Sequence, residues 1–219
     1  MEAAIRICGV ASIALVLLIF LFVLREGLPL FSKYPIGRFL AERSWQPTLG
    51  PPAGPRFGLL PNLWGSFLVT AGAALLAVPL GLGSAVCLAE VVPRSLRDIL
   101  KPVVELIATI PSVAIGFVGA VAINPLVKEA FHLDTGKSAL AGSIMLAFMA
   151  VPTIVTIADD AITAVPKAFR DGSLALGSTR WQGISRIVVP AAMPGIIAGV
   201  MLGIGRAIKG LGRVIFRPL

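Results

Sequence analysis

Charged side chains are scarce in this chain. They make up 14% of its 219 residues, against roughly 25% in ordinary soluble domains. Hydrophobic residues make up 57%, and a soluble core of this size could not bury that much apolar surface. Proline and glycine are by contrast abundant, with 17 and 23 residues, and membrane helices tolerate both better than compact soluble bundles do. These proportions imply that a lipid bilayer is the second solvent of this chain.

Cysteine and histidine are nearly absent, with two residues and one residue. Cys8 and Cys87 lie in separate apolar runs, so they form neither a disulfide framework nor a metal site. His132 has no Cys or His cluster near it, and the apolar runs hold no convergent set of His, Glu, Asp and Ser. We therefore expect no metal, no cofactor and no enzymatic activity in the chain itself.

The net charge of +8 does not indicate a nucleic-acid partner. The basic residues lie in short connectors between apolar runs, without a continuous stripe and with few aromatics among them. Such charges are typical of the flanks of membrane spans, where they face lipid headgroups. Counted on each side of the membrane, they do not decide the orientation of the chain.

The apolar runs predict an all-α fold, a polytopic transmembrane helical bundle. Each run is close to the roughly 20 residues that cross a ~30 Å hydrocarbon core. The expected spans are residues 7–24, 66–89, 103–123, 138–157 and 190–208. Prolines interrupt several of them, and repeated broken helices favour a transport bundle over a simple anchor. These prolines are Pro79, Pro111, Pro152 and Pro194.

The domain organisation follows from these runs. Residues 1–24 hold an uncleaved first transmembrane helix, because no small-residue cleavage site follows the apolar run. Residues 25–65 are polar and rich in proline, which predicts a long extramembrane loop with a short interfacial helix around residues 36–43. Residues 66–208 form the main bundle.

The fifth span carries glycines four residues apart, which lie on one helix face and allow another helix to approach closely. They are Gly195, Gly199 and Gly203. The partner helix lies either in this subunit or in a second one.

The connector at residues 158–189 is of mixed polarity and has a helical pattern. Pro166 can begin a helix and Gly177 can end it, and a second helical stretch runs over residues 180–189. The sequence therefore predicts two short amphipathic helices around a glycine. We call these two helices, residues 166–189, the knob, and such a structure can dock into a groove of a partner.

The knob resembles the cytoplasmic coupling motif of type I ABC importer permeases, E-A-A-x-x-x-G-x9-I-x-L-P. The spacing matches, with departures at the first three positions and at Val189, and Gly172 in place of Ala weakens the helix by roughly 1 kcal/mol. The matching positions are Asp171, Gly172, Ser173, Gly177, Ile187 and Pro190.

Further segments are similar to motifs of phosphate permeases within that family, and together they cover about residues 1–208. They include Ile110-Pro111-Ser112-Val113, Val151-Pro152-Thr153-Ile154 and Gly205-Arg206-Ala207, the first half of a G-R-A-x-G-E-T motif. Trp45-Gln46-Pro47 resembles the C-type more than the A-type phosphate permease subunit.

The resemblance implies a phosphate importer of a bacterial inner membrane that works by alternating access. Its implied partners are a homologous second permease subunit, a cytoplasmic ATPase dimer that hydrolyses the ATP, and an extracytoplasmic phosphate-binding protein. It places the N-terminus and residues 158–189 in the cytoplasm and residues 25–65 outside.

Arg206 lies late in the fifth span, and a charge inside the membrane indicates a functional role by default. Its guanidinium offers paired donors that suit phosphate, so Arg206 is the candidate for the phosphate pathway. The alternative is that Arg206 extends to the outer surface. We expect Glu105, Asp159 and Asp160 to be interfacial, the first near Lys101 and the others paired with the cations of the knob.

The expected Gly-Glu-Thr and a sixth span do not follow Ile208; residues 209–219 read as a basic tail instead. We interpret this end as a truncation or frame change, or as a natural shortened variant. Two alternative functions stay open: a permease for another oxyanion such as sulfate or molybdate, and a truncated, non-transporting membrane interaction subunit.

Overall fold

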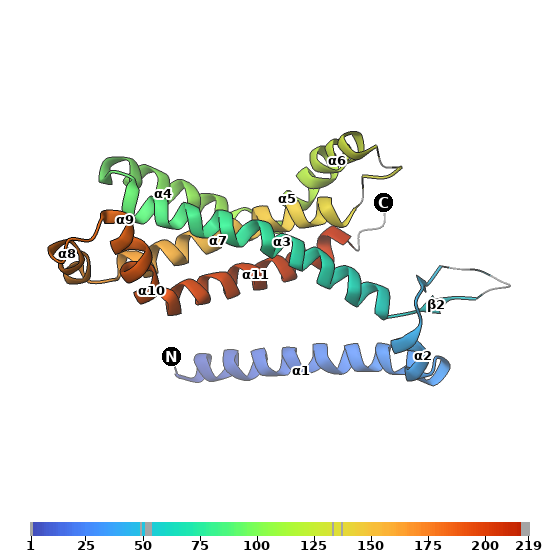
Figure 1. The fold of residues 1–219 in the computed structure, drawn as a ribbon. Helices are drawn as coiled ribbons and strands as arrows, with labels where there is room; N and C mark the ends of the chain where they lie inside the picture. The colour runs from blue at the N-terminus through green and yellow to red at the C-terminus, as the bar shows by residue number, and fades with distance from the viewer. Residues whose placement is uncertain (1, 49, 51–53, 133, 137, 216–219) are drawn as a thin grey trace. The chain divides into compact units, whose positions relative to one another are not determined.

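The computed structural model describes residues 2–48, 50, 54–132, 134–136 and 138–215. The chain forms two compact units, Met1–Trp64 and Gly65–Leu219, and the boundary falls inside helix α3 (Leu60–Val86). Figure 1 draws the elements of both units.

The first unit contains helix α1 (Glu2–Lys33), helix α2 (Ile36–Ala41) and an antiparallel pair of two-residue strands, β1 (Trp45–Gln46) and β2 (Arg56–Phe57). Helix α1 continues past the expected end at residue 24, through Pro29. Its 32 residues measure about 48 Å at 1.5 Å per residue, which exceeds the thickness of a hydrocarbon core.

The proline-rich segment is more ordered than the expected loop. The ring of Phe57 meets the rings of Tyr34 and Trp45 edge-on, with centroids 5.7 Å and 5.9 Å apart. The Gly58 amide donates to the Ser44 carbonyl at 2.9 Å, and an added Cβ at Gly58 would lie within 2.7 Å of that carbonyl oxygen. Aromatic contacts and a close backbone approach therefore hold the base of this hairpin.

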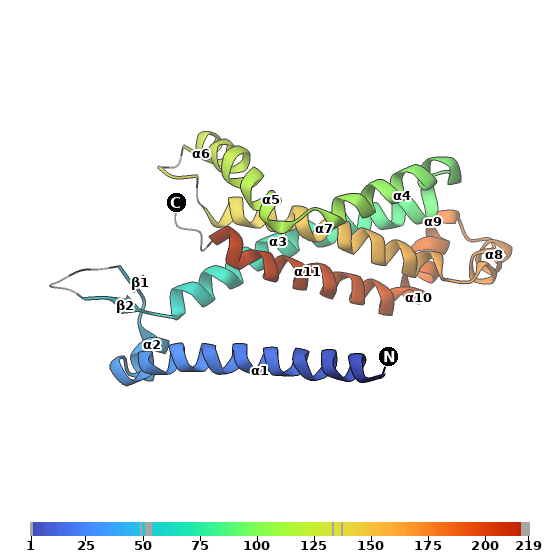
Figure 2. The same cartoon turned by 180° about the vertical axis from the view of Figure 1, so that it is seen from behind.

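The second unit is helical, apart from its connectors. Its elements after α3 are, in order, the π-helical segment η1 (Cys87–Val91), α4 (Arg94–Thr109), α5 (Ser112–Val118), the π-helical segment η2 (Gly119–Ile123), α6 (Asn124–Phe131), α7 (Ala139–Thr163), α8 (Lys167–Ala175), α9 (Arg180–Gly183), the π-helical segment η3 (Ile184–Val188), α10 (Val189–Ala191) and α11 (Met193–Ile215). Helices α8 and α9 lie at one end of α7 and α11, and α6 lies at the other (Figures 1 and 2).

Within the described residues, four helical stretches are long and apolar enough to cross a membrane: Ile5–Pro29, Leu60–Val91, Ser112–Phe131 and Ala139–Thr163. A fifth exists if Arg180–Ala191 and Met193–Gly210, which are bent by 70°, count as one span. The expectation of an all-α bundle with about five spans is therefore confirmed.

The expected third span, residues 103–123, is wrong as a single helix. Helix α4 ends at Thr109, Ile110 and Pro111 take extended backbone angles, and α5 begins at Ser112. Pro111 has no N–H to donate, and it disfavours helical angles at the residue before it. The apolar stretch that is long enough to span lies further along the chain, at Ser112–Phe131.

The end of the bundle also differs from expectation. Helix α11 begins at Met193 and continues to Ile215, so part of the expected tail at residues 209–219 is helical. Pro194 lies in the first turn, where a backbone N–H would have no partner within the helix, so the N–H that proline lacks costs no hydrogen bond. Residues 216–219 lie outside the described part of the chain.

Helix α7 forms the centre of the second unit. One apolar cluster joins it to α3 and α11 and includes Ala73, Leu146, Ile154 and Ala207. A second cluster, at the end that carries α8 and α9, includes Ala85, Ile162, Val188 and Ile196. Small residues set the close spacing: an added Cβ at Gly81 would lie 2.8 Å from the Cγ2 of Ile154.

The glycine face of the last helix lies against α7 of the same chain. An added Cβ at Gly199 would lie 3.2 Å from the Cβ of Ile157, and one at Gly203 would lie 2.5 Å from the Cγ1 of Ile154. An added Cβ at Gly195 would collide with the Cβ of Ala161. Of the two partners that the sequence leaves open, the structure thus provides the one within this subunit.

Candidate functional site

The knob has the two helices that its sequence predicts. Pro166 precedes α8, and Gly177, with φ of +79°, follows its end in a conformation that favours glycine. Thr179 then begins α9 with a capping box: its hydroxyl accepts from the Gln182 amide at 3.3 Å, and its own amide donates to the Gln182 side chain at 2.9 Å.

The six expected coupling residues do not share one environment. Asp171, Gly172, Gly177 and Pro190 are exposed, and Ile187 is half-buried. Ser173 is 3% exposed and lies against Gly183, where an added Cβ would be 2.7 Å from the Ser173 hydroxyl oxygen.

Ser173 and Gly183 therefore set the spacing between the two knob helices. Gly183 is not singled out by any pattern in the sequence. The exposed side of the knob carries Leu176 and Trp181, which are 89% and 67% exposed.

A charge cluster joins α4 to α7 next to the knob. The Arg97 guanidinium donates to both carboxylate oxygens of Asp159 at 2.9 Å and to the Thr163 hydroxyl at 2.7 Å. The Lys101 ammonium lies 3.2 Å from Asp159 and 2.5 Å from Asp160. Two cations and two carboxylates thus balance across this contact.

The prediction that Asp159 and Asp160 pair with the cations of the knob is wrong. Their partners Arg97 and Lys101 lie four residues apart on one face of α4, and that face meets α7. Asp159 is also fully buried. Glu105 lies exposed on α4, and Lys101 binds the two aspartates of α7.

The hydrogen bond to Asp160 raises the pKa of Lys101, against a smaller lowering by burial. A raised pKa means that the charged form of Lys101 contributes its full stabilisation below the ordinary lysine value of 10.5. Its contribution is lost only as the pH rises through the still higher pKa of the folded protein.

Arg206 lies half-buried beside a pocket of about 360 Å³. Its guanidinium donates to the Thr153 hydroxyl at 3.2 Å and to the carbonyl of Ala108 in the last turn of α4. The break at Pro111 leaves the last carbonyls of α4 without partners in their own helix, and Arg206 supplies one. The pocket is lined by Thr109, Ile110, Pro111, Ser112, Met149, Arg206, Lys209 and Gly210.

The pocket and the Arg206–Thr153 hydrogen bond bring together three segments that the sequence singles out separately, namely Ile110-Pro111, Thr153 and Arg206. Two cations, Arg206 and Lys209, line the pocket. Thr109 also lines it, and its hydroxyl donates to the Leu106 carbonyl at 2.7 Å. The donors of the two cations suit a small anion with several oxygen acceptors.

Comparison with known proteins assigns the family. Residues 77–216 match the family described as "Binding-protein-dependent transport system inner membrane component". This match covers more than half of the chain. The chain belongs to this family. It is accordingly a multi-pass membrane component of a transport system.

Individual relatives of this inner membrane component agree with that assignment. The chain is 41% identical over 202 residues to the "Probable ABC transporter permease protein YqgH" of Bacillus subtilis, and the match covers 91% of this chain and 64% of the relative. It is 34% identical over 189 residues to the "Phosphate transport system permease protein PstC" of Mesorhizobium japonicum, with 78% of this chain and 56% of the relative covered. It is 33% identical over 178 residues to the "Phosphate transport system permease protein PstC 1" of Mycobacterium tuberculosis, with 72% of this chain and 52% of the relative covered. The chain thus spans about half to two thirds of the length of these relatives.

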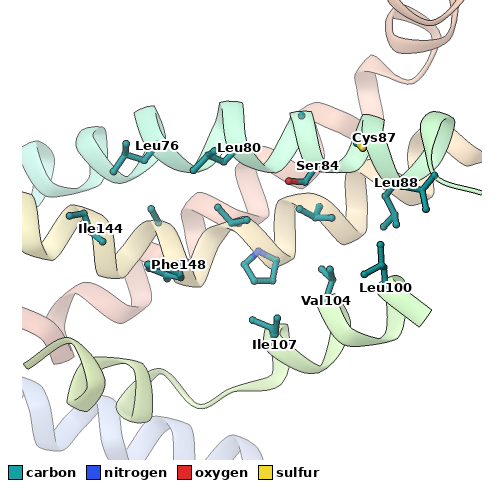
Figure 3. A pocket seen from close by; sticks show the side chains of 16 residues that line it. Leu76, Leu80, Ser84, Cys87, Leu88, Leu100, Val104, Ile107, Ile144 and Phe148 are labelled. Atoms are coloured by element: carbon teal, nitrogen blue, oxygen red, sulfur yellow. The ribbon is translucent and has the colours of Figure 1, made fainter. Parts of the chain in front are cut away.

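A larger cavity of about 730 Å³ lies between α4, α3 and α7 of this inner membrane component (Figure 3). Figure 3 shows Leu100, Val104 and Ile107 of α4 on one side and Leu76 and Leu80 of α3 on another. Aliphatic side chains dominate its lining, so it does not suit an anion. Among the described residues, no three His, Cys, Asp or Glu side chains lie close enough to hold a metal ion.

Proposed function

We propose that this chain is a transmembrane permease subunit of an ATP-driven importer of inorganic phosphate and forms part of its translocation pathway. The observation that carries the proposal is the pocket at Arg206, where the guanidinium of a residue in the apolar helix α11 lines a space of about 360 Å³ at a helix break. The relatives that are named phosphate transport system permease proteins support phosphate as the substrate.

The pocket is chemically suited to phosphate. A guanidinium can donate two parallel hydrogen bonds to two oxygens of the anion, and a lysine ammonium can donate to the others. Arg206 and Lys209 together balance the charge of a phosphate dianion within a space that is partly closed to water. Since Arg206 already binds the Ala108 carbonyl, an entering anion competes with that carbonyl for the guanidinium.

The knob supports the proposal that the importer is driven by an ATPase. In this proposal the knob lies in the cytoplasm and its exposed apolar side chains, Leu176 and Trp181 among them, dock into a groove of an ATPase dimer that hydrolyses the ATP. The residues assigned to this coupling are Asp171, Gly172, Ser173, Gly177, Ile187 and Pro190.

The remaining partners belong to the proposal as well. A homologous second permease subunit completes the pathway, and an extracytoplasmic binding protein delivers phosphate on the other side of the membrane. The N-terminus is then cytoplasmic, and residues 25–65 face outward in a bacterial inner membrane.

The test is uptake of ³²P-labelled phosphate into proteoliposomes that contain this chain, the second permease subunit and the ATPase, with the binding protein added outside. We expect uptake that requires ATP and that unlabelled phosphate suppresses, while sulfate and molybdate at the same concentration do not.

Two other outcomes would overturn the proposal. Stronger competition by sulfate or molybdate than by phosphate would assign the chain to another oxyanion. A chain that co-purifies with the ATPase but supports no uptake of any of the three anions would be a non-transporting interaction subunit.

A further inference from the structure

We propose that Arg170 is the positioning residue through which movement of the knob reaches the transmembrane helices. Arg170 lies in α8, next to the coupling motif, and its side chain joins α8 to the ends of both α3 and α7. This inference rests on the proposed function, because it concerns how ATP hydrolysis by a partner is transmitted to the pathway.

The contacts of Arg170 use four of the five N–H donors of its guanidinium. Nε and Nη2 donate to one carboxylate oxygen of Glu90 at 3.0 Å and 2.7 Å. Nη1 donates to the Val165 carbonyl at 2.5 Å, and Nη2 also donates to the Ile162 carbonyl at 2.9 Å. The fork of an arginine can make this set of bonds at once, whereas a lysine ammonium cannot match its geometry.

The partners of Arg170 lie at the ends of two different helices. Glu90 lies in η1, the π-helical continuation of α3, Ile162 lies in the last turn of α7, and Val165 lies just after that helix ends. The Ile162 carbonyl also accepts from the Val165 amide at 3.3 Å, so Arg170 adds a side-chain donor to the turn that ends α7. One side chain of the knob therefore closes a junction between α3, α7 and α8.

Burial makes this ion pair stronger than an ordinary surface pair. The side chains of Glu90 and Arg170 are 11% and 25% exposed. Val165, whose carbonyl Arg170 binds, packs with Ala85 of α3 and Val188 in a single apolar cluster. Because both charges are largely removed from water, separating them leaves each poorly solvated, and the pair resists separation when α8 is displaced.

The place of Glu90 in the chain adds a second argument. The amide of Val92 donates to the carbonyl of Cys87, five residues earlier, and this hydrogen bond closes a wide π-type turn. Val92 and Pro93 then take extended backbone angles. Single π-turns are found frequently at functional sites, where a helix changes its spacing. A displacement of Glu90 therefore acts on the last turn of α3, next to the connection that leads into α4.

The other cations of the knob do not make such a junction. Lys167, Arg180 and Arg186 are exposed, and none of them takes part in the ion pairs found within the described part of the chain. Arg170 thus differs from its neighbours in contacts and in burial. Arg186→Gln is accordingly a matched control for Arg170→Gln, because it makes the same chemical change in the same segment.

The experiment measures phosphate uptake and ATP hydrolysis in the same proteoliposomes and takes their ratio. We expect Arg170→Gln to lower the uptake per ATP hydrolysed by about threefold or more, in the range found for residues that couple distant sites. We expect Glu90→Gln to lower it similarly and the double variant to lower it no further, because both changes remove one contact. Arg186→Gln should keep the wild-type ratio.

Each contrary outcome is distinguishable. A wild-type chain that supports no uptake contradicts the proposed function itself. A wild-type ratio in assembled Arg170→Gln and Glu90→Gln transporters contradicts the role of Arg170 alone. If neither variant assembles while Arg186→Gln does, the contact serves folding only, and the inference is overturned as well.

Discussion

Replacing Asp159 with asparagine removes a charge that is fully buried between α7 and α4. The substitution preserves the shape of the side chain, but Arg97 and Lys101 then face each other without the central carboxylate. Removing one partner of a buried ion pair typically costs about 3–5 kcal/mol. We expect the lower end of that range, since Lys101 keeps Asp160 and both cations are partly exposed.

A loss of about 3 kcal/mol corresponds to a fall in Tm of about 6–12 °C for a chain of this size. The assay is thermal unfolding of the detergent-solubilised protein. The matched control is Asp160→Asn, which makes the same change one residue further on, where the side chain is 60% exposed. An exposed pair contributes at most about 1 kcal/mol, so the control should shift Tm by less than about 4 °C.

Equal and small shifts in the two variants would refute the reasoning. Such a result would mean that Asp159 is not buried against α4 in the folded protein, and that α4 is held to α7 by other contacts.

Two further changes test the packing of α11 and the fold of the knob. Gly203→Ala should lower Tm by about 2–10 °C, because the new Cβ would lie 2.5 Å from Ile154, whereas Gly205→Ala, with nothing within 4 Å of its Cβ, should leave Tm equal or higher. Equal shifts would contradict the contact between α11 and α7. Thr179→Ala should destabilise α9 by about 1 kcal/mol through loss of the capping box, measured as faster proteolytic cleavage after Arg180 or Arg186. The control Ser185→Ala removes a hydroxyl that only bonds within its own turn, and an equal rate in the two variants would contradict the capping role.

The fold class could be predicted because lipid imposes long apolar runs with a known minimum length. The knob could be predicted because Pro166 and Gly177 act through local backbone geometry that short stretches of sequence determine. The third span could not be placed correctly from hydropathy alone, because apolar residues continue on both sides of Pro111 while the helix does not.

The charge contacts were the least predictable feature. Arg97 and Asp159 lie 62 residues apart, and Arg170 and Glu90 lie 80 apart, so their pairing depends on how α3, α4 and α7 pack together. The i, i+4 spacing of Arg97 and Lys101 and the adjacent Asp159 and Asp160 were visible, but either set could have faced the knob. For Arg206, the sequence singled out the charge in a span, while the pocket depends on the tertiary contact with Ala108 and Thr153.

The central claim is that phosphate passes the pocket at Arg206, and uptake by an Arg206→Gln variant tests it most directly. We expect ATP-dependent phosphate uptake to fall by about tenfold or more, as for loss of a hydrogen bond to a charged group, of about 1.5–3 kcal/mol. Arg94→Gln, the same change at an exposed residue of α4, should leave uptake unchanged. Wild-type uptake by an assembled Arg206→Gln transporter would contradict the claim.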